Sequence, residues 1–330
     1  MAKNKYNRDR IKKFKKESAM AILIKDKFKD WEKEAQERFD QLKANEEELN
    51  KIFIELYGLQ DELDYRVEDK DVSVSLADRE RDIKSLISYA VGCMFGRYSL
   101  DEEGLVFAGG TFDMSRYSKF KPDADNILLI TDDEYFQNDE ADITNKFVNF
   151  VSVVYGQETL EENLQYIAET LGGSGTSRAI IRKYFVSKFF VDHLKTYKKR
   201  PIYWQFDSGS ANGVKALMYL HRYDENLLGY LQTDYLSKLS QAYNGRIELR
   251  ESQKLASSNP REIAGYDKEI QKIQKQQKEL RDFDEKVGHL ALKKIALDLD
   301  DGVIVNYDKL QRDPETNEKF MILTKGVKEP

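Results

Sequence analysis

Hydrophobic residues recur at three- and four-residue spacings along the first part of the chain. This spacing places them on one side of an α-helix, so it predicts a long amphipathic helix, and we interpret residues 21–63 as a helical spacer. Gly58 is well placed to end the helix, because glycine readily adopts the left-handed conformation of a C-terminal cap. The apolar stripe consists of Ile24, Phe28, Trp31, Ala35, Phe39, Leu42, Leu49, Phe53 and Leu56.

The middle of the chain mixes helical and strand patterns. Helical spacing predicts helices at residues 79–95, around 147–154, at 160–171 and at 179–199, the last of them basic and aromatic. Short apolar runs bounded by turn residues predict a strand at 127–130 and a β-hairpin formed by 202–206 and 214–219. We therefore expect a mixed α/β body.

Two charged helical patterns follow, at residues 234–297. Asn259 and Pro260 between them are typical of a helix cap and a first helical residue, so they predict a second helix that starts there. Two long helices joined at this point form an antiparallel helical hairpin. Its expected seam consists of Ile263, Tyr266, Ile270, Ile273, Leu280 and Val287.

These patterns predict an α+β fold that is predominantly helical. Long amphipathic helices and an antiparallel helical hairpin surround a small body that contains a β-hairpin. Ile304–Tyr307 is expected to form a short strand before a polar tail. The predicted parts are a basic disordered arm at 1–20, the spacer at 21–63, the body at 64–233, the hairpin at 234–297 and the strand with its tail at 298–330.

Charge and cysteine content narrow the function classes. The net charge of −6 argues against a uniformly basic nucleic-acid wrapper, although residues 3–16 hold eight Lys or Arg and one acidic residue. Any DNA contact must therefore use local basic patches. The single cysteine, Cys93, excludes an intramolecular disulfide and a cysteine-based zinc site. No apolar run is long enough to span a membrane, so we expect a cytoplasmic protein without a membrane partner.

Sequence patterns for an autonomous enzyme are missing. Transfer of a methyl group to an adenine amine usually needs an Asn/Asp-Pro-Pro-aromatic tetrad, and Asn259–Pro260 is followed by Arg261 instead. The glycine-rich segments at 109–110 and 172–175 lack the strand that precedes a cofactor loop. The three histidines have no metal-ligand spacing. We expect no catalytic, cofactor or metal site on this chain.

The strongest signal for nucleic-acid contact runs from Arg182 to Tyr223, where Lys and Arg alternate with aromatic residues. Cations can hold phosphates, and exposed rings can stack on bases. The same pattern also fits a packed aromatic core beside a solvated basic helix, and the residues alone leave both open. The candidate DNA-binding residues are Lys198, Lys199, Arg200, Tyr203, Trp204, Lys215, His221 and Arg222.

Several sequence strings resemble the C-terminal region of PglX-type adenine-specific DNA methyltransferases from BREX phage-defence systems. The resemblance covers about residues 30–310, and the first two strings are long enough to be specific. The strings are FIELYGLQDEL at 53–63, SYAVGCMFGRYSLD at 88–101, KRPIYW at 199–204, KALMYLHRY at 215–223, DLDDGV at 298–303 and VNY at 305–307.

The resemblance implies a non-catalytic part that recognises DNA and acts as a scaffold. The family's catalytic domain is absent here, so S-adenosylmethionine is implied only for that domain. Implied partners are double-stranded DNA, the methyltransferase catalytic domain or subunit, and other BREX components. The alternative is a protein–protein interaction module, in which the hairpin docks the catalytic half or another defence component without contacting DNA. We expect no methyl transfer by this chain alone.

Overall fold

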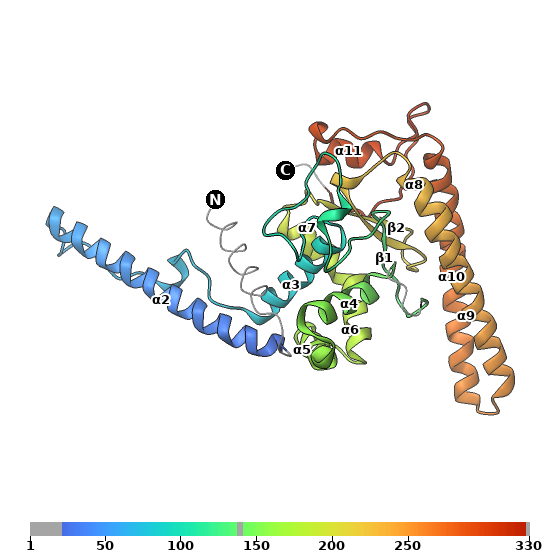
Figure 1. The fold of residues 1–330 in the computed structure, drawn as a ribbon, viewed down its shortest axis with the longest axis horizontal. Helices are drawn as coiled ribbons and strands as arrows, with labels where there is room; N and C mark the ends of the chain where they lie inside the picture. The colour runs from blue at the N-terminus through green and yellow to red at the C-terminus, as the bar shows by residue number, and fades with distance from the viewer. Residues whose placement is uncertain (1–21, 137–140, 328–330) are drawn as a thin grey trace.

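The computed structural model describes residues 22–136 and 141–327. The predicted basic arm at residues 1–20 lies outside this range. A central body carries two long extensions, one at each side (Figure 1). The predicted fold class is confirmed: the structure is predominantly helical, with one small antiparallel sheet.

The first extension is helix α2, Ile24–Tyr57, which ends at Gly58 in the left-handed conformation with φ of 68°. Only the first half of the predicted stripe is buried, from Ile24 to Phe39. Trp31 fixes this half to the body, because its indole Nε1 donates to Asp82 Oδ2 at 2.8 Å. The second half projects away from the body, with its apolar residues exposed (Figure 1).

A group of helices forms one side of the body. Capping side chains explain where several of them begin: Asp78, Asp142 and Thr176 each accept a hydrogen bond from the backbone of the first turn that follows. The predicted basic, aromatic helix is interrupted by a π-helical segment. The elements are α3 Arg79–Met94, α4 Ile143–Tyr155, α5 Leu160–Leu171, α6 Ser177–Tyr184, the π segment Phe185–Phe189 and α7 Phe190–Thr196.

The sheet has the strand order β1-β3-β2, and both pairings are antiparallel. The strands are β1 Leu128–Leu129, β2 Tyr203–Asp207 and β3 Lys215–Tyr219, which confirms the predicted β-hairpin. The two faces of the sheet bury different cores. Tyr203 and Tyr219 pack with α3 to α7, whereas Trp204 and Met218 pack with the C-terminal helices.

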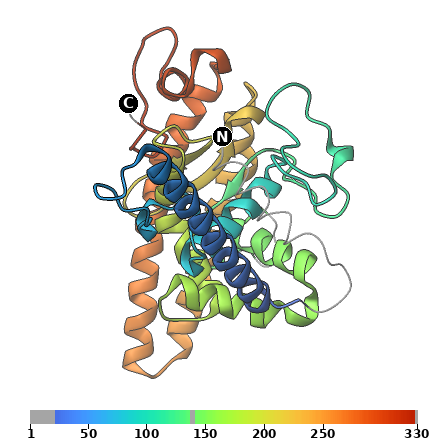
Figure 2. The same ribbon diagram turned by 90° about the vertical axis from the view of Figure 1, so that its left-hand side faces the viewer.

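The second extension is the predicted antiparallel hairpin, which reaches well beyond the body in both ribbon views (Figures 1 and 2). Asn259 caps its second helix by accepting from the backbone N–H of Arg261 at 3.0 Å, and Pro260 is the first helical residue. Its elements are α8 Leu227–Tyr230, the π segment Leu231–Leu236, α9 Ser237–Ala256 and α10 Pro260–Ala291.

The predicted strand at Ile304–Tyr307 is wrong, because these residues belong to helix α11, Val303–Lys309. Tyr307 and Leu310 are buried at a three-residue spacing, which fits one helical face, and a four-residue segment with three apolar residues does not distinguish the two structures. The predicted polar tail also contributes to the core. Residues 322–324 lie beside β2, where Thr324 N donates to Gln205 O at 2.8 Å.

Short helical turns connect the larger elements. The 3₁₀ turns are Asp69–Asp71, Met114–Arg116, Gln157–Thr159, Leu220–Arg222 and Leu299–Asp301. No helix of the described residues is both long enough and apolar enough to cross a membrane.

Candidate nucleic-acid interface

A basic turn follows α7 and presents Lys198, Lys199 and Arg200 to solvent. Lys198 and Lys199 both have positive φ, 51° and 64°, and Lys199 N donates to Leu194 O at 2.7 Å. This left-handed turn ends the helix as a cap does, and Pro201 prevents the helix from continuing. Among the residues that the structure describes, none of the three cations forms an ion pair. They are therefore available to anions.

Tyr203 and Trp204 point into the two cores instead of outward. Tyr203 stacks on Phe95 at 5.3 Å between ring centroids. The Trp204 ring lies against Tyr307 at 4.9 Å, and its Nε1 donates to Pro201 O at 3.2 Å. Because both rings are buried in this conformation, neither is in position to stack on a base.

The remaining predicted contacts are partly buried. Lys215 Nζ donates to Val186 O at 3.0 Å. Arg222 donates to three backbone carbonyls, and its guanidinium lies 3.8 Å from the centroid of the Phe112 ring. His221 packs on Tyr219 at 5.0 Å between centroids. Arg222 is thus engaged in holding the body together.

The strand register decides which candidates lie near one another. Tyr203 pairs with Tyr219, and Leu220 N donates to Ile202 O at 3.0 Å, so His221 lies at the same end of the β-hairpin as the basic turn. Lys215 pairs with Asp207 at the opposite end. The structure therefore joins His221 to the basic turn and separates Lys215 from it.

Sequence reasoning missed Arg97, which lies just after α3. Its Nη1 donates to Tyr219 OH at 2.9 Å, and its guanidinium is 5.5 Å from the centroid of the Tyr98 ring. In the sequence, Arg97 belongs to the string at 88–101, which indicates only a family resemblance. The sequence feature that could have indicated the role of Arg97 is its position between Gly96, which follows the end of the helix, and Tyr98.

His193 is buried in the aromatic cluster beside the basic turn. Its Nε2 accepts from Tyr203 N at 3.1 Å, and its ring lies 4.6 Å from that of Tyr197. Burial lowers the pKa of His193 to about 3, and the positive charge of Arg97 contributes. The imidazole is therefore neutral in the native state at neutral pH.

This depressed pKa predicts a loss of stability in acid. The unfolded chain binds a proton at His193 below a pH of about 6.5, whereas the native state resists protonation until the pH approaches 3. From pH 7 to pH 5, the linkage costs about 2 kcal/mol of unfolding free energy. His193→Gln keeps an acceptor for the Tyr203 N–H but has no group that titrates in this range. Between pH 7 and pH 5, its unfolding free energy should therefore fall by about 2 kcal/mol less than that of the wild type, as measured by denaturant unfolding. Parallel pH profiles for the two proteins would contradict a neutral buried His193.

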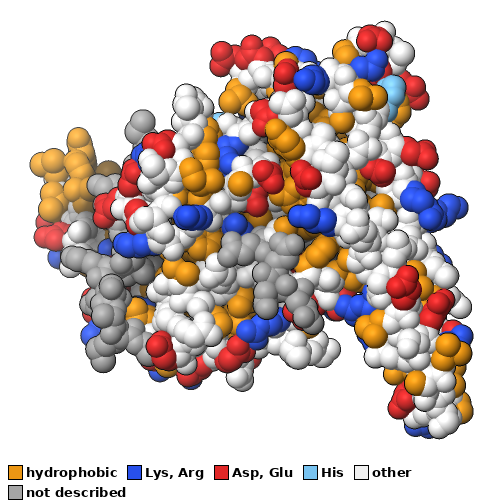
Figure 3. Space-filling view, turned by 45° about the vertical axis from the view of Figure 1, so that its right-hand side comes forward, with side chains coloured by type: hydrophobic (Ala, Val, Ile, Leu, Met, Phe, Trp, Pro, Cys, Tyr) orange, Lys and Arg blue, Asp and Glu red, His pale blue; other side chains and the backbone are white. Residues whose placement is uncertain are grey.

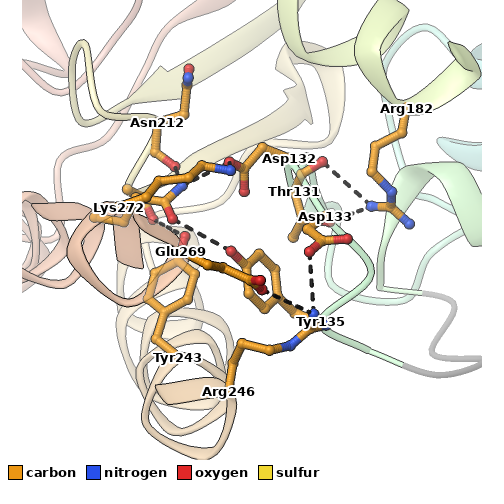
Figure 4. A network of polar contacts seen from close by, with 12 residues as sticks. Thr131, Asp132, Asp133, Tyr135, Arg182, Asn212, Tyr243, Arg246, Glu269 and Lys272 are labelled. Atoms are coloured by element: carbon orange, nitrogen blue, oxygen red, sulfur yellow. Dashed lines mark hydrogen bonds and ion pairs between the residues drawn. The ribbon is translucent and has the colours of Figure 1, made fainter. Parts of the chain in front are cut away.

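A polar network fixes the helical hairpin to the body (Figure 4). Lys272 Nζ on α10 pairs with Asp132 at 2.6 Å, and Gln276 Nε2 donates to the same carboxylate at 2.9 Å. Arg246 on α9 pairs with Asp133 at 3.2 Å and with Glu269 at 3.6 Å. The hairpin is therefore held in a defined orientation relative to the body.

The acidic residues of this network serve as partners for cations. Within residues 22–136 and 141–327, no three His, Cys, Asp or Glu side chains are grouped so as to hold a metal ion. On the face shown in Figure 3, basic and acidic side chains are interspersed. On this face, basic side chains therefore do not form one continuous patch.

No family model matches the chain. The chain is 51% identical over 288 residues, 87% of its length, to the adenine-specific methyltransferase PglX of Lacticaseibacillus casei (strain Zhang). It is 36% identical over 300 residues, covering 82% of the chain, to the adenine-specific methyltransferase BrxX of Escherichia coli O9:H4 (strain HS). The matches cover 24% and 25% of these proteins, so the chain spans about a quarter of the length of the curated relatives it matches.

Proposed function

From the match of this chain to a partial region of PglX, we propose that it is the C-terminal, non-catalytic part of a PglX-type adenine-specific DNA methyltransferase in BREX phage defence. In this role it recognises double-stranded DNA and orients it for a catalytic domain elsewhere. That domain binds S-adenosylmethionine and transfers the methyl group. The complex, with other BREX components, works in the cytoplasm.

The observation that carries this proposal is the exposed, unpaired basic turn of Lys198, Lys199 and Arg200. Phosphate contacts supply much of the affinity of a DNA-binding protein and set its position on the duplex. A chain with a net charge of −6 can approach DNA only where its cations are concentrated. Three adjacent cations that have no acidic partner within residues 22–136 and 141–327 meet this condition.

Changing Lys198, Lys199 and Arg200 together to alanine should weaken binding to duplex DNA about tenfold or more at 100 mM salt. The loss follows from the removal of up to three phosphate contacts. Each lost contact should also reduce the dependence of log K on log salt by about one. Titration of a labelled duplex at several salt concentrations measures both quantities.

The matched control replaces three exposed lysines of α10, Lys268, Lys275 and Lys278, with alanine. It removes the same total charge at a place far from the basic turn. Equal losses in the two variants would mean that only net charge matters. Unchanged affinity and salt slope in the first variant would refute the assignment of the basic turn.

A second function, docking of the remaining part of the methyltransferase, is favoured by the far half of α2. Phe53 is 48% exposed and Leu56 is 71% exposed, and these residues lie on one projecting helix. The neighbouring Glu48, Glu55 and Glu62 are exposed and would repel phosphates. Such a surface fits a protein partner with an apolar patch rimmed by basic residues. The relatives have about three quarters of their length outside the matched region, which supplies that partner.

The exposed apolar residues favour α2 over the hairpin at 234–297 as this docking element. Large exposed hydrophobic residues are clustered on the projecting half of α2, whereas in the hairpin region they are scattered. If docking alone is the function, the wild-type chain will not bind duplex DNA in the titration above.

A further inference from the structure

Arg97 is a partly buried cation without a carboxylate partner among the residues that the structure describes. Its Nη1 donates to Tyr219 OH at 2.9 Å, and its Nε is 3.4 Å from Tyr98 OH. Its Nη2 makes no hydrogen bond to any described residue. The Nη2 side of the guanidinium therefore has no hydrogen-bond partner among the described residues.

Two other arginines with limited exposure, Arg182 and Arg250, are neutralised by acids, whereas Arg222 donates to three backbone carbonyls. Arg182 pairs with Asp142 at 2.6 Å, and Arg250 pairs with Glu269 at 2.8 Å. Removing a guanidinium from water without a counter-charge is costly, and so proteins usually supply one. Among the described residues, the Arg97 side chain has neither a carboxylate nor a backbone carbonyl as a hydrogen-bond partner, which calls for another source of negative charge.

The surroundings of Arg97 compensate its charge only partly. The centroids of the Tyr98 and Tyr219 rings lie 5.5 and 5.9 Å from the guanidinium, and such cation–π contacts stabilise a cation less than a carboxylate partner does. His193 and His221 add no negative charge. Burial, followed by the charge of Arg97, lowers the pKa of both, and the Nδ1 of each is buried without a hydrogen bond to any described residue.

The position of Arg97 connects it to the basic turn. Tyr197, which precedes Lys198, belongs to the same cluster, because its ring packs on His193 and its pKa responds to the charge of Arg97. An anion at Arg97 would thus lie close to the start of a segment that carries three further cations. This positive field favours an anion of high charge.

We propose that Arg97 anchors a site for a phosphate group, with the free Nη2 side of its guanidinium as the donor. Planar guanidinium matches phosphate oxygens by two parallel hydrogen bonds. The phosphate belongs either to a nucleic-acid backbone or to a free phosphate compound. The site goes beyond the proposed function, since it involves a residue outside the basic turn and does not require that the chain bind DNA.

The three histidines of the chain provide a direct test on the wild-type protein. NMR titration of their ring protons in inorganic phosphate, against chloride at equal ionic strength, should raise the pKa of His221 by up to about one unit, because a bound anion offsets the charge of Arg97. The shift should saturate with phosphate concentration. The ring-proton chemical shifts of His289, which lies on α10 with its Nε2 2.6 Å from Asp313 Oδ2, are the internal control and should be the same in phosphate as in chloride. A pKa of His221 that is indifferent to phosphate would overturn the proposal.

Variants separate binding from a purely structural role of Arg97. Arg97→Gln should abolish the response to phosphate, and Arg97→Lys should reduce the affinity for phosphate several-fold, since it keeps the charge and loses the fork. Arg178→Gln, at an exposed arginine paired with Glu161, should behave as wild type. An undiminished phosphate response in Arg97→Gln would overturn the site. If that variant does not fold, the wild-type titration decides.

Adding a short DNA duplex in place of phosphate distinguishes the two sources. A saturable phosphate response without duplex binding supports the Arg97 site for free phosphate and contradicts the proposed DNA function. Duplex binding without any response of His221 to either ligand overturns the Arg97 site and leaves the DNA function standing. A response to both assigns the site to the nucleic-acid backbone.

Discussion

Replacing Trp204 with alanine should lower the free energy of unfolding by about 3–5 kcal/mol. The indole is fully buried between the sheet and the C-terminal helices, where it packs on Tyr307 and donates to Pro201 O. Its removal leaves a large cavity and an unsatisfied carbonyl, and both costs add to the lost burial of apolar surface.

Urea unfolding, followed by circular dichroism, measures this effect. Phe53→Ala is the matched control, because Phe53 is 48% exposed on the projecting half of α2 and should change the unfolding free energy by less than about 0.5 kcal/mol. A Trp204→Ala protein with wild-type stability but weakened DNA binding would show that the indole is a surface contact after all.

Asp142→Asn should destabilise the protein by about 3–5 kcal/mol, because it leaves the guanidinium of Arg182 buried without its counter-charge. Arg182 Nη1 pairs with Asp142 Oδ2 at 2.6 Å and also donates to the Thr131 hydroxyl (Figure 4). Asparagine keeps the side-chain oxygen that caps α4, so the substitution isolates the ion pair from the helix cap.

A double-mutant cycle with Arg182→Met provides the control for this ion pair. Once the guanidinium is gone, Asp142→Asn no longer strands a buried charge, so the double variant should cost clearly less than the sum of the two single changes. Chemical denaturation of the four proteins gives the coupling energy. Strict additivity would mean that the two side chains do not stabilise each other.

Local rules predicted much of the fold. Gly58, Asn259 and Pro260 mark helix ends through their own conformational preferences, and the structure confirms each of them. The antiparallel helical hairpin and the β-hairpin followed from periodicity and turn residues in the same way. These features depend on residues close in sequence, which is why they could be predicted without a fold.

Features that depend on distant packing could not be predicted. The apolar stripe of α2 resumes at Leu49 after a gap around Asn45, yet the body covers only its first half. Both faces of β2 are buried by helices far away in sequence, and the alternation of cations with aromatic residues does not by itself show that Tyr203 and Trp204 are buried. Only the structure shows that Arg97 has no carboxylate partner among the described residues.

Binding of the wild-type chain to duplex DNA as a function of salt tests the central claim most directly. The exposed cations Lys198, Lys199 and Arg200 predict binding that weakens with rising salt, with a slope of log K against log salt of about −2 to −3. Failure of the isolated chain to bind duplex DNA even at low salt would contradict a DNA-recognition role.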